Sequence, residues 1–94
     1  MLANRVDITV PLNRANDYTL EKPPMVQLNG GLPQILQCKT HEFLESLKNE
    51  GFASQEEFDR ATAEIQHSGH TVIDSSATAV DLETVISGFR KETT

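Results

Sequence analysis

Apolar and polar residues alternate over residues 5–12, near the start of the chain. A period of two is typical of a strand that is buried on one face only. Residues 18–21 could form a second extended segment, and residues 25–28 a third. The Asn-Gly-Gly sequence at 29–31 tolerates positive φ and therefore indicates a tight hairpin turn. These patterns predict a small, mainly antiparallel sheet within residues 1–38.

The pattern then changes to the start and stop signals of helices. Thr40 can cap a first helix, and Gly51 is placed to end it in the left-handed conformation. Ser54 and Glu57 form the capping-box pattern of a second helix, in which each side chain accepts a hydrogen bond from the other residue's backbone N–H. We therefore predict an αα-hairpin over residues 39–69.

Residues 44–63 resemble the helical hairpin of short bacterial C-terminal oligomerisation domains; their sequence is LESLKNEGFASQEEFDRATA. Those domains share a leucine-rich helix, a glycine and then a Ser/Thr-x-Glu-Glu-Phe sequence. Any well-capped αα-hairpin has much the same pattern. We therefore interpret the resemblance as local helix chemistry and do not assign the chain to that family.

Residues 70–94 are expected to add one strand and one helix. A β-branched run at 71–73 predicts the strand. The helix is predicted from an apolar stripe with helical spacing, formed by Leu82, Val85, Ile86 and Phe89. Gly88 lies within this helix, where glycine is unfavourable, and so it indicates a close approach by another backbone. The whole chain, 1–94, is thus expected to be one α+β domain, in which a small sheet packs on the hairpin and the C-terminal helix in two layers. An all-helical domain behind a disordered N-terminal arm is the alternative.

Charge is distributed unevenly along the chain. The net charge is −6, and residues 41–64 hold seven acidic groups against two basic ones. Such a charge repels nucleic acid and anionic lipid, so we expect neither as a direct partner. Glu56, Glu57 and Asp59 could instead face a basic protein surface, or they could simply keep a helix solvated.

The compartment is inferred from cysteine usage and from the N-terminal sequence. The single cysteine cannot form an internal disulfide, which fits a reducing compartment. The first ten residues alternate and carry charges, unlike a signal peptide, and no apolar run approaches the length of a membrane span. We therefore expect a cytoplasmic protein.

The four soft metal-ligand side chains fall into two pairs with identical spacing, Cys38-x-x-His41 and His67-x-x-His70. Two antiparallel helices would bring the start of the first beside the end of the second, and with them the two pairs. One thiolate and three imidazoles would suit a structural zinc ion, whose closed shell of four ligands has no catalytic position. The alternative is that the four are unrelated residues, with Cys38 a small buried apolar group and His67 a partner of a helix dipole.

No catalytic arrangement is recognisable in the sequence. Cys38 could pair with His41 or His70 as a nucleophile, but no glycine-rich oxyanion loop and no orienting Asp or Asn lies beside them. We therefore predict a non-enzymatic interaction module, a small accessory, adaptor or assembly protein that docks to a partner protein or self-associates. The alternatives are an acidic inhibitor or decoy that blocks a basic surface, and a small zinc-stabilised binding domain.

Overall fold

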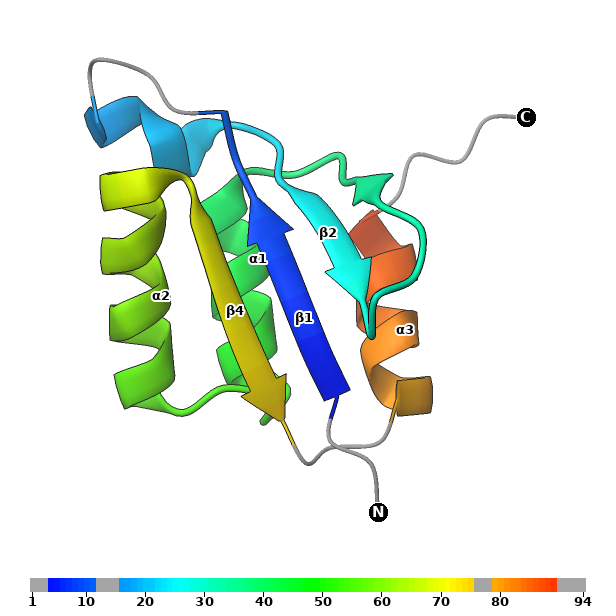
Figure 1. The fold of residues 1–94 in the computed structure, drawn as a ribbon. Coiled ribbons are helices and arrows are strands. Elements are labelled where there is room, and N and C mark those ends of the chain that lie inside the picture. The colour runs from blue at the N-terminus through cyan, green and yellow to red at the C-terminus, as the bar shows by residue number, and fades with distance from the viewer. Residues whose placement is uncertain (1–3, 12–15, 76–78, 90–94) are drawn as a thin grey trace.

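The computed structural model describes residues 4–11, 16–75 and 79–89. Its elements follow one another along the chain (Figure 1) as β1 (Asn4–Thr9), the 3₁₀ helix η1 (Asn16–Glu21), β2 (Met25–Leu28), β3 (Gln34–Ile35), α1 (Thr40–Asn49), α2 (Gln55–Ser68), β4 (His70–Ser75) and α3 (Ala79–Phe89). The predicted α+β fold class is therefore confirmed, including the αα-hairpin and the C-terminal helix.

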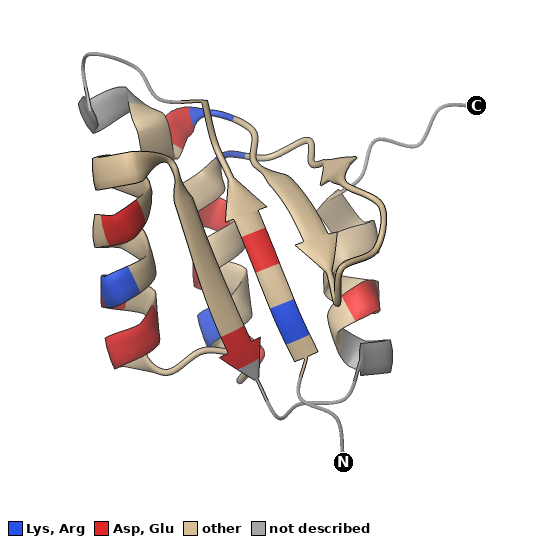
Figure 2. Cartoon of the chain, in the orientation of Figure 1, with Lys and Arg blue, Asp and Glu red and all other residues tan. Residues whose placement is uncertain are grey.

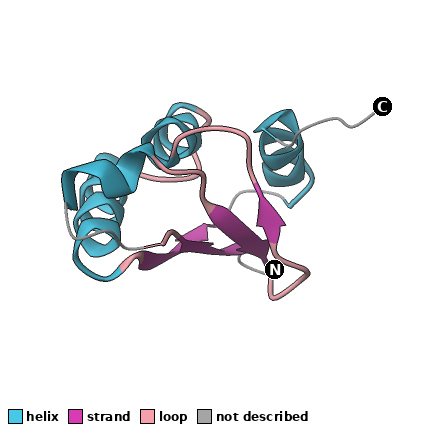
Figure 3. Cartoon of the chain, turned by 90° about the horizontal axis from the view of Figure 1, so that it is seen from above, coloured by secondary structure: helices cyan, strands magenta, loops and turns pink. Residues whose placement is uncertain are grey.

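The sheet has four strands in the order β3-β2-β1-β4, and every neighbouring pair is antiparallel. Val6 in the central strand β1 pairs with Leu28 on one side and with Ile73 on the other. The helices α1, α2 and α3 all lie on the same side of the sheet (Figure 3), as the predicted two-layer arrangement requires. The other face of the sheet is left uncovered by these helices.

The core lies between the sheet and the helices. Val6 and Ile8 of β1 are fully buried and alternate with Arg5, Asp7 and Thr9, so the predicted period-two strand is confirmed. The strand is shorter than predicted. Val10, which was predicted to lie in the strand, follows its last residue. Its backbone N–H donates to the carbonyl of Gly69, at the end of α2, at 2.7 Å. The other large apolar side chains that are fully buried are Val26, Leu36, Phe43, Leu44, Leu47, Ile65, Ile73, Leu82 and Ile86.

The segment at 18–21 does not extend as a strand, contrary to the prediction, because it lies within the 3₁₀ helix η1. It packs against α1 and α2 instead of joining the sheet. Thr19 is fully buried there, and the carbonyl of Lys22 accepts both the backbone N–H of Thr40 at 3.0 Å and its hydroxyl at 2.7 Å. These contacts with a distant helix determine the conformation, and local sequence does not reveal them.

Helix α1 begins one residue earlier than predicted. Lys39 is the N-cap, and its backbone N–H donates to the carboxylate of Glu42 at 2.9 Å. Thr40 therefore does not cap the helix, because its hydroxyl is used to bind the preceding loop. Gly51 follows the helix with φ of +86°, as its predicted role as a left-handed stop requires.

The start and the end of α2 agree with the prediction. The Ser54 hydroxyl accepts from the backbone N–H of Glu57 at 3.1 Å, and the Glu57 carboxylate accepts from the backbone N–H of Ser54 at 2.9 Å. Gly69 ends the helix with φ of +78°. Because the chain then turns directly into β4, the capped helix fixes where that strand begins.

Helix α3 buries the predicted stripe. Leu82 and Ile86 are fully buried, while Val85 and Phe89 pack against the core from its edge. Gly88, however, does not mark a close approach, because a Cβ atom added there would meet no heavy atom within 4 Å among the described residues. The glycine is exposed and lines a depression between α3 and α1.

Candidate docking surface

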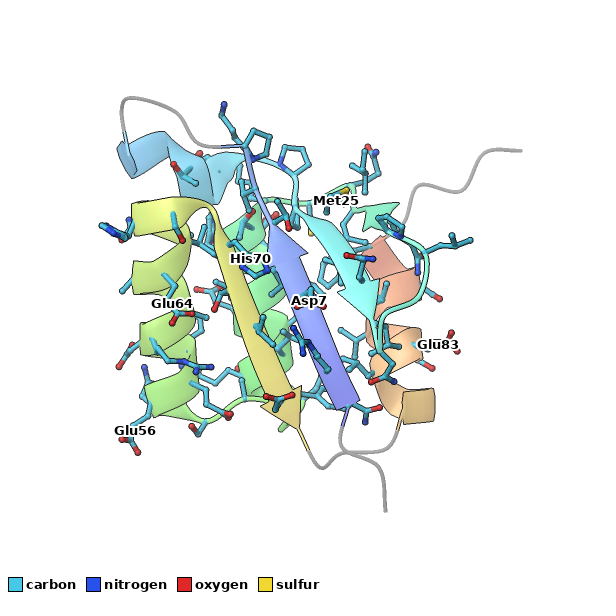
Figure 4. The ribbon with its side chains drawn as sticks, viewed as in Figure 1. Asp7, Met25, Glu56, Glu64, His70 and Glu83 are labelled. Atoms are coloured by element: carbon cyan, nitrogen blue, oxygen red, sulfur yellow. The ribbon has the colours of Figure 1, made fainter. Side chains whose placement is uncertain are left out.

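The helices leave one face of the sheet open (Figure 3). Cross-strand partners point to the same side of a sheet, and Val6 and Ile8 point toward the helices. The registers therefore place on the uncovered face the side chains of Arg5, Asp7, Thr9, Met25, Gln27, Ile35, His70, Val72 and Asp74. Figure 4 shows Asp7, Met25 and His70 on this side of the molecule.

The middle of this face carries a small charged cluster. The carboxylate of Asp7 lies 3.4 Å from Nε of Arg5 and 3.8 Å from Nε2 of His70. Asp7 is the least exposed of the three, with 18% of its side chain accessible. The cluster thus links β1 to β4 across the face. The contact between Asp7 and His70 is an ion pair only when the imidazole is protonated. Figure 2 shows the acidic and basic positions on the ribbon.

One end of the same face is apolar. A hollow of about 400 Å³ lies where β1, β2 and β3 approach the loops beside η1, and it is lined by Thr9, Pro11, Pro23, Met25 and Ile35. Ile35 is 64% exposed although its side chain is large and apolar. The connection between β2 and β3 exposes a second large apolar side chain, Leu32, at 85%. Exposed apolar side chains that gather around a hollow are typical of surfaces that bind another molecule.

A second depression lies between α2 and the outer strand β4, with a volume of about 640 Å³. A guanidinium nitrogen of Arg60 donates to the carbonyl of Val72 at 3.0 Å, and the hydroxyl of Thr71 donates to the carboxylate of Glu64. The residues that line this groove are Arg60, Ala63, Glu64, His67, Ser68, His70, Thr71 and Val72. Its walls are a helix flank on one side and the edge of a sheet on the other.

The structure separates the four predicted metal ligands. His67 and His70 line the groove just described, and the side chain of His70 points to the uncovered face of the sheet. Cys38 packs against the core on the helix side, and His41 lies in the first turn of α1. Nowhere in residues 4–11, 16–75 and 79–89 do three or more His, Cys, Asp or Glu side chains form a group that could hold a metal ion. The helices are antiparallel as expected, but the period of β4 turns His70 away from them.

Cys38 is also poorly suited to act as a ligand or a nucleophile. Burial, and to a lesser extent the Glu42 carboxylate, raises the pKa of its thiol from 9.0 to about 11. The thiolate is the form that binds metals and attacks electrophiles, and it is scarce at neutral pH when the pKa is raised. This cysteine therefore has the properties of a small, half-buried apolar side chain.

The three acidic residues predicted to face a partner differ in their surroundings. Glu57 is committed to the capping box of α2, as described above. Asp59 accepts a hydrogen bond from the side chain of Gln55 at 3.0 Å, and Glu56 is exposed in the first turn of the helix. At least one of the three carboxylates thus has a local structural role that any partner would have to leave in place.

Sequence reasoning missed the apolar hollow. Its residues come from three separate stretches, and only the pairing of β2 with β1 and β3 brings Met25 beside Thr9 and Ile35. The alternation in β1 could have shown that Thr9 points away from the core.

No protein-family model matches this chain, and no curated protein and no solved structure matches it either. Within the part of the chain that the structure describes, none of the helices is long and apolar enough to cross a membrane.

Proposed function

We propose that this protein is a non-enzymatic interaction module that docks a partner protein, or a second copy of itself, on the uncovered face of its sheet. The observation that carries the proposal is the apolar hollow at one end of that face, with Ile35 exposed at its edge. Burying this surface would release water from apolar groups, which is the main favourable term in protein association.

The composition of the hollow favours a protein as the partner. Prolines, a methionine and an isoleucine offer apolar contact area and few polar groups, which suits an apolar side chain from another chain. The net charge of −6 disfavours nucleic acid and anionic membranes. We place the protein in the cytoplasm as part of the same proposal, supported by the free thiol of Cys38.

The acidic decoy has less support than docking on the sheet. A decoy surface needs carboxylates that are free to meet basic groups, and Glu57 is already used to cap α2. The remaining exposed acidic groups are spread over the helix surface, which is the usual arrangement on a solvated helix.

The proposal can be tested by replacing Ile35 with lysine, which places a charge at the edge of the hollow. Ser87→Lys is the matched control, since it adds the same charge at an exposed site on α3, in the helical layer. Affinity capture from the native source should recover the same partner with the wild-type protein and S87K, and lose it with I35K. Light scattering of the purified protein would show whether the partner is a second copy. Binding that I35K and S87K leave equally intact would contradict docking at the hollow.

A further inference from the structure

Among the described residues, the backbone groups at the outer edge of β4 pair with no further strand. Asp7 and Val72 are partners in the register, and the carbonyl of Val72 faces away from β1, since it accepts from Arg60 on the opposite side. Backbone groups alternate in direction along a strand, so those of His70 and Asp74 point the same way. β4 is the last strand in the order β3-β2-β1-β4, and no further strand of the described residues pairs with it.

The two edges of the sheet differ in length. β3 consists of two residues, Gln34–Ile35, and a short edge strand offers little to a new strand. β4 runs over six residues, His70–Ser75, and offers a full row of donors and acceptors. Its protection is limited to side chains, mainly the guanidinium of Arg60 on the Val72 carbonyl and a 3.4 Å contact from the Ser68 hydroxyl to the His70 carbonyl.

Helix α2 extends beyond this edge. In both Figure 1 and Figure 3, α2 lies outward of β4, while α1 lies behind the middle of the sheet. A fifth strand would lie about 4.8 Å outside β4 and would therefore cover α2 as the present strands cover α1. The flank that it would cover includes Ala63, which is exposed and small enough to admit a side chain from above.

The same overhang argues against a second copy as the fifth strand. Two antiparallel β4 strands paired across a two-fold axis normal to the sheet would place a second α2 on the same face, where it would compete with the first for the space over the paired strands. A single extended segment has no such helix. The edge thus fits a strand from a different protein, or from a part of a partner that is extended before it binds.

We propose that the groove between α2 and β4 binds an extended segment of a partner protein as a fifth strand, with an apolar β-branched side chain opposite Val72 and a basic side chain opposite Asp74. The inference rests on the proposed function in that a protein partner is required, but it uses a different surface from the apolar hollow. The side chains of Val72 and Asp74 lie on the uncovered face, so the partner residues opposite them lie there too.

Charge complementarity supports the basic residue. Asp74 is exposed at the end of β4, and the chain as a whole carries a net charge of −6. Opposite charges across neighbouring strands stabilise a pair, whereas an acidic residue would be repelled. On binding, the N–H of the new strand replaces Arg60 at the Val72 carbonyl, so one hydrogen bond is exchanged for another. The guanidinium then moves to the rim of the groove, where it stays solvated.

The experiment begins with selection of random dodecapeptides displayed on phage against the immobilised protein, with no partner assumed. Selected peptides are synthesised and titrated against the wild-type protein, V72P, V72T, D74K and I35K. Val72→Pro removes the backbone N–H that faces away from β1, and an edge strand tolerates proline at such a position. Val72→Thr keeps this N–H. We expect V72P to weaken binding about tenfold or more, since it leaves a peptide carbonyl unpaired, and V72T to change it little. D74K should weaken peptides that carry Lys or Arg.

A second measurement does not depend on the folding of any variant. Peptides are N-methylated at alternate residues and titrated against the wild-type protein. Methylation in one register should abolish binding and in the other leave it intact, because only every second N–H of an added strand faces β4. Amide resonances of His70, Val72 and Asp74 should shift in the nitrogen-15 spectrum.

The outcomes separate this inference from the proposed function. Peptides that are lost with V72P or with one methylation register, and kept with I35K, support the groove. Peptides lost only with I35K overturn the groove while leaving docking at the hollow in place. A selection that yields no binding peptide also overturns the groove, and the capture experiment with I35K then decides the proposed function independently.

Discussion

The ring of Phe89 in α3 meets the ring of Phe43 in α1 edge to face, with centroids 5.9 Å apart and an interplanar angle of 86°. This contact attaches the C-terminal helix to the helical hairpin. A second link is the hydrogen bond from the backbone N–H of Gln37 to the carbonyl of Phe89, at 2.6 Å. Phe43 is fully buried and Phe89 lies at the boundary of the core, so the aromatic contact adds to the burial of Leu82 and Ile86 in holding α3.

Phe89→Ala should therefore lower the free energy of unfolding by about 2–3 kcal/mol, somewhat less than the loss at a fully buried phenylalanine. Urea unfolding followed by circular dichroism would measure the change. Ser87→Ala on the exposed side of the same helix is the control and should stay within about 0.5 kcal/mol of the wild type. Equal effects of the two substitutions would show that α3 does not depend on the aromatic contact.

Ser54→Ala should cost about 1 kcal/mol of stability, because it leaves the backbone N–H of Glu57 without its hydroxyl acceptor. Glu57→Gln should cost less, since an amide oxygen can still accept from the backbone of Ser54. Glu56→Gln at the neighbouring exposed site should be close to neutral. Thermal melts of the three variants would check this order. A large loss of stability with E56Q would show that Glu56, and not Glu57, has the structural role.

The raised pKa of Cys38 predicts how stability responds to alkaline pH. The pKa of the thiol is about 11 in the folded protein and 9.0 for the unperturbed group. Between pH 9 and pH 11 the native state therefore binds more protons than the unfolded state. This contribution is fully present below about pH 9 and is lost as the pH rises toward 11. Denaturant midpoints of the wild type and Cys38→Ala, compared at intervals across this range, should converge as the pH rises. Parallel curves would contradict the assignment.

We expect the purified protein to bind no zinc at a structural site. Cys38 and His41 lie on the helix side of the sheet, and the side chain of His70 points to the other face. Metal analysis should return substoichiometric zinc, and the melting temperature should not change when a chelator is added. If His67→Ala and chelator each lowered the melting temperature strongly, the two pairs would have to come together in solution, contrary to their separation in the structure.

Signals that act within a few residues were readable from the sequence. The capping box of Ser54 and Glu57 and the left-handed stops at Gly51 and Gly69 depend only on neighbouring backbone groups. The alternation in β1 was equally local. These features were sufficient to predict the order and type of most elements and, through them, the fold class.

Features that depend on distant contacts were not readable. Residues 18–21 form a 3₁₀ helix because their segment packs on two helices, and Thr40 donates to Lys22, which lies in the loop after that helix. The candidate surfaces are of the same kind. The hollow needs the register of three strands, and the groove needs the placement of α2 relative to β4, neither of which is encoded in a short motif.

The order of the strands also has a consequence for synthesis on the ribosome. β1 can pair with β2 soon after Leu28 emerges, but its other edge pairs with β4, whose Ile73 follows only after both helices of the hairpin have been made. The nascent chain therefore carries an open edge of its central strand throughout that interval. Such an edge is a site for mispairing between chains, so slow translation of the hairpin should lower the yield of folded protein more than slow translation after β4.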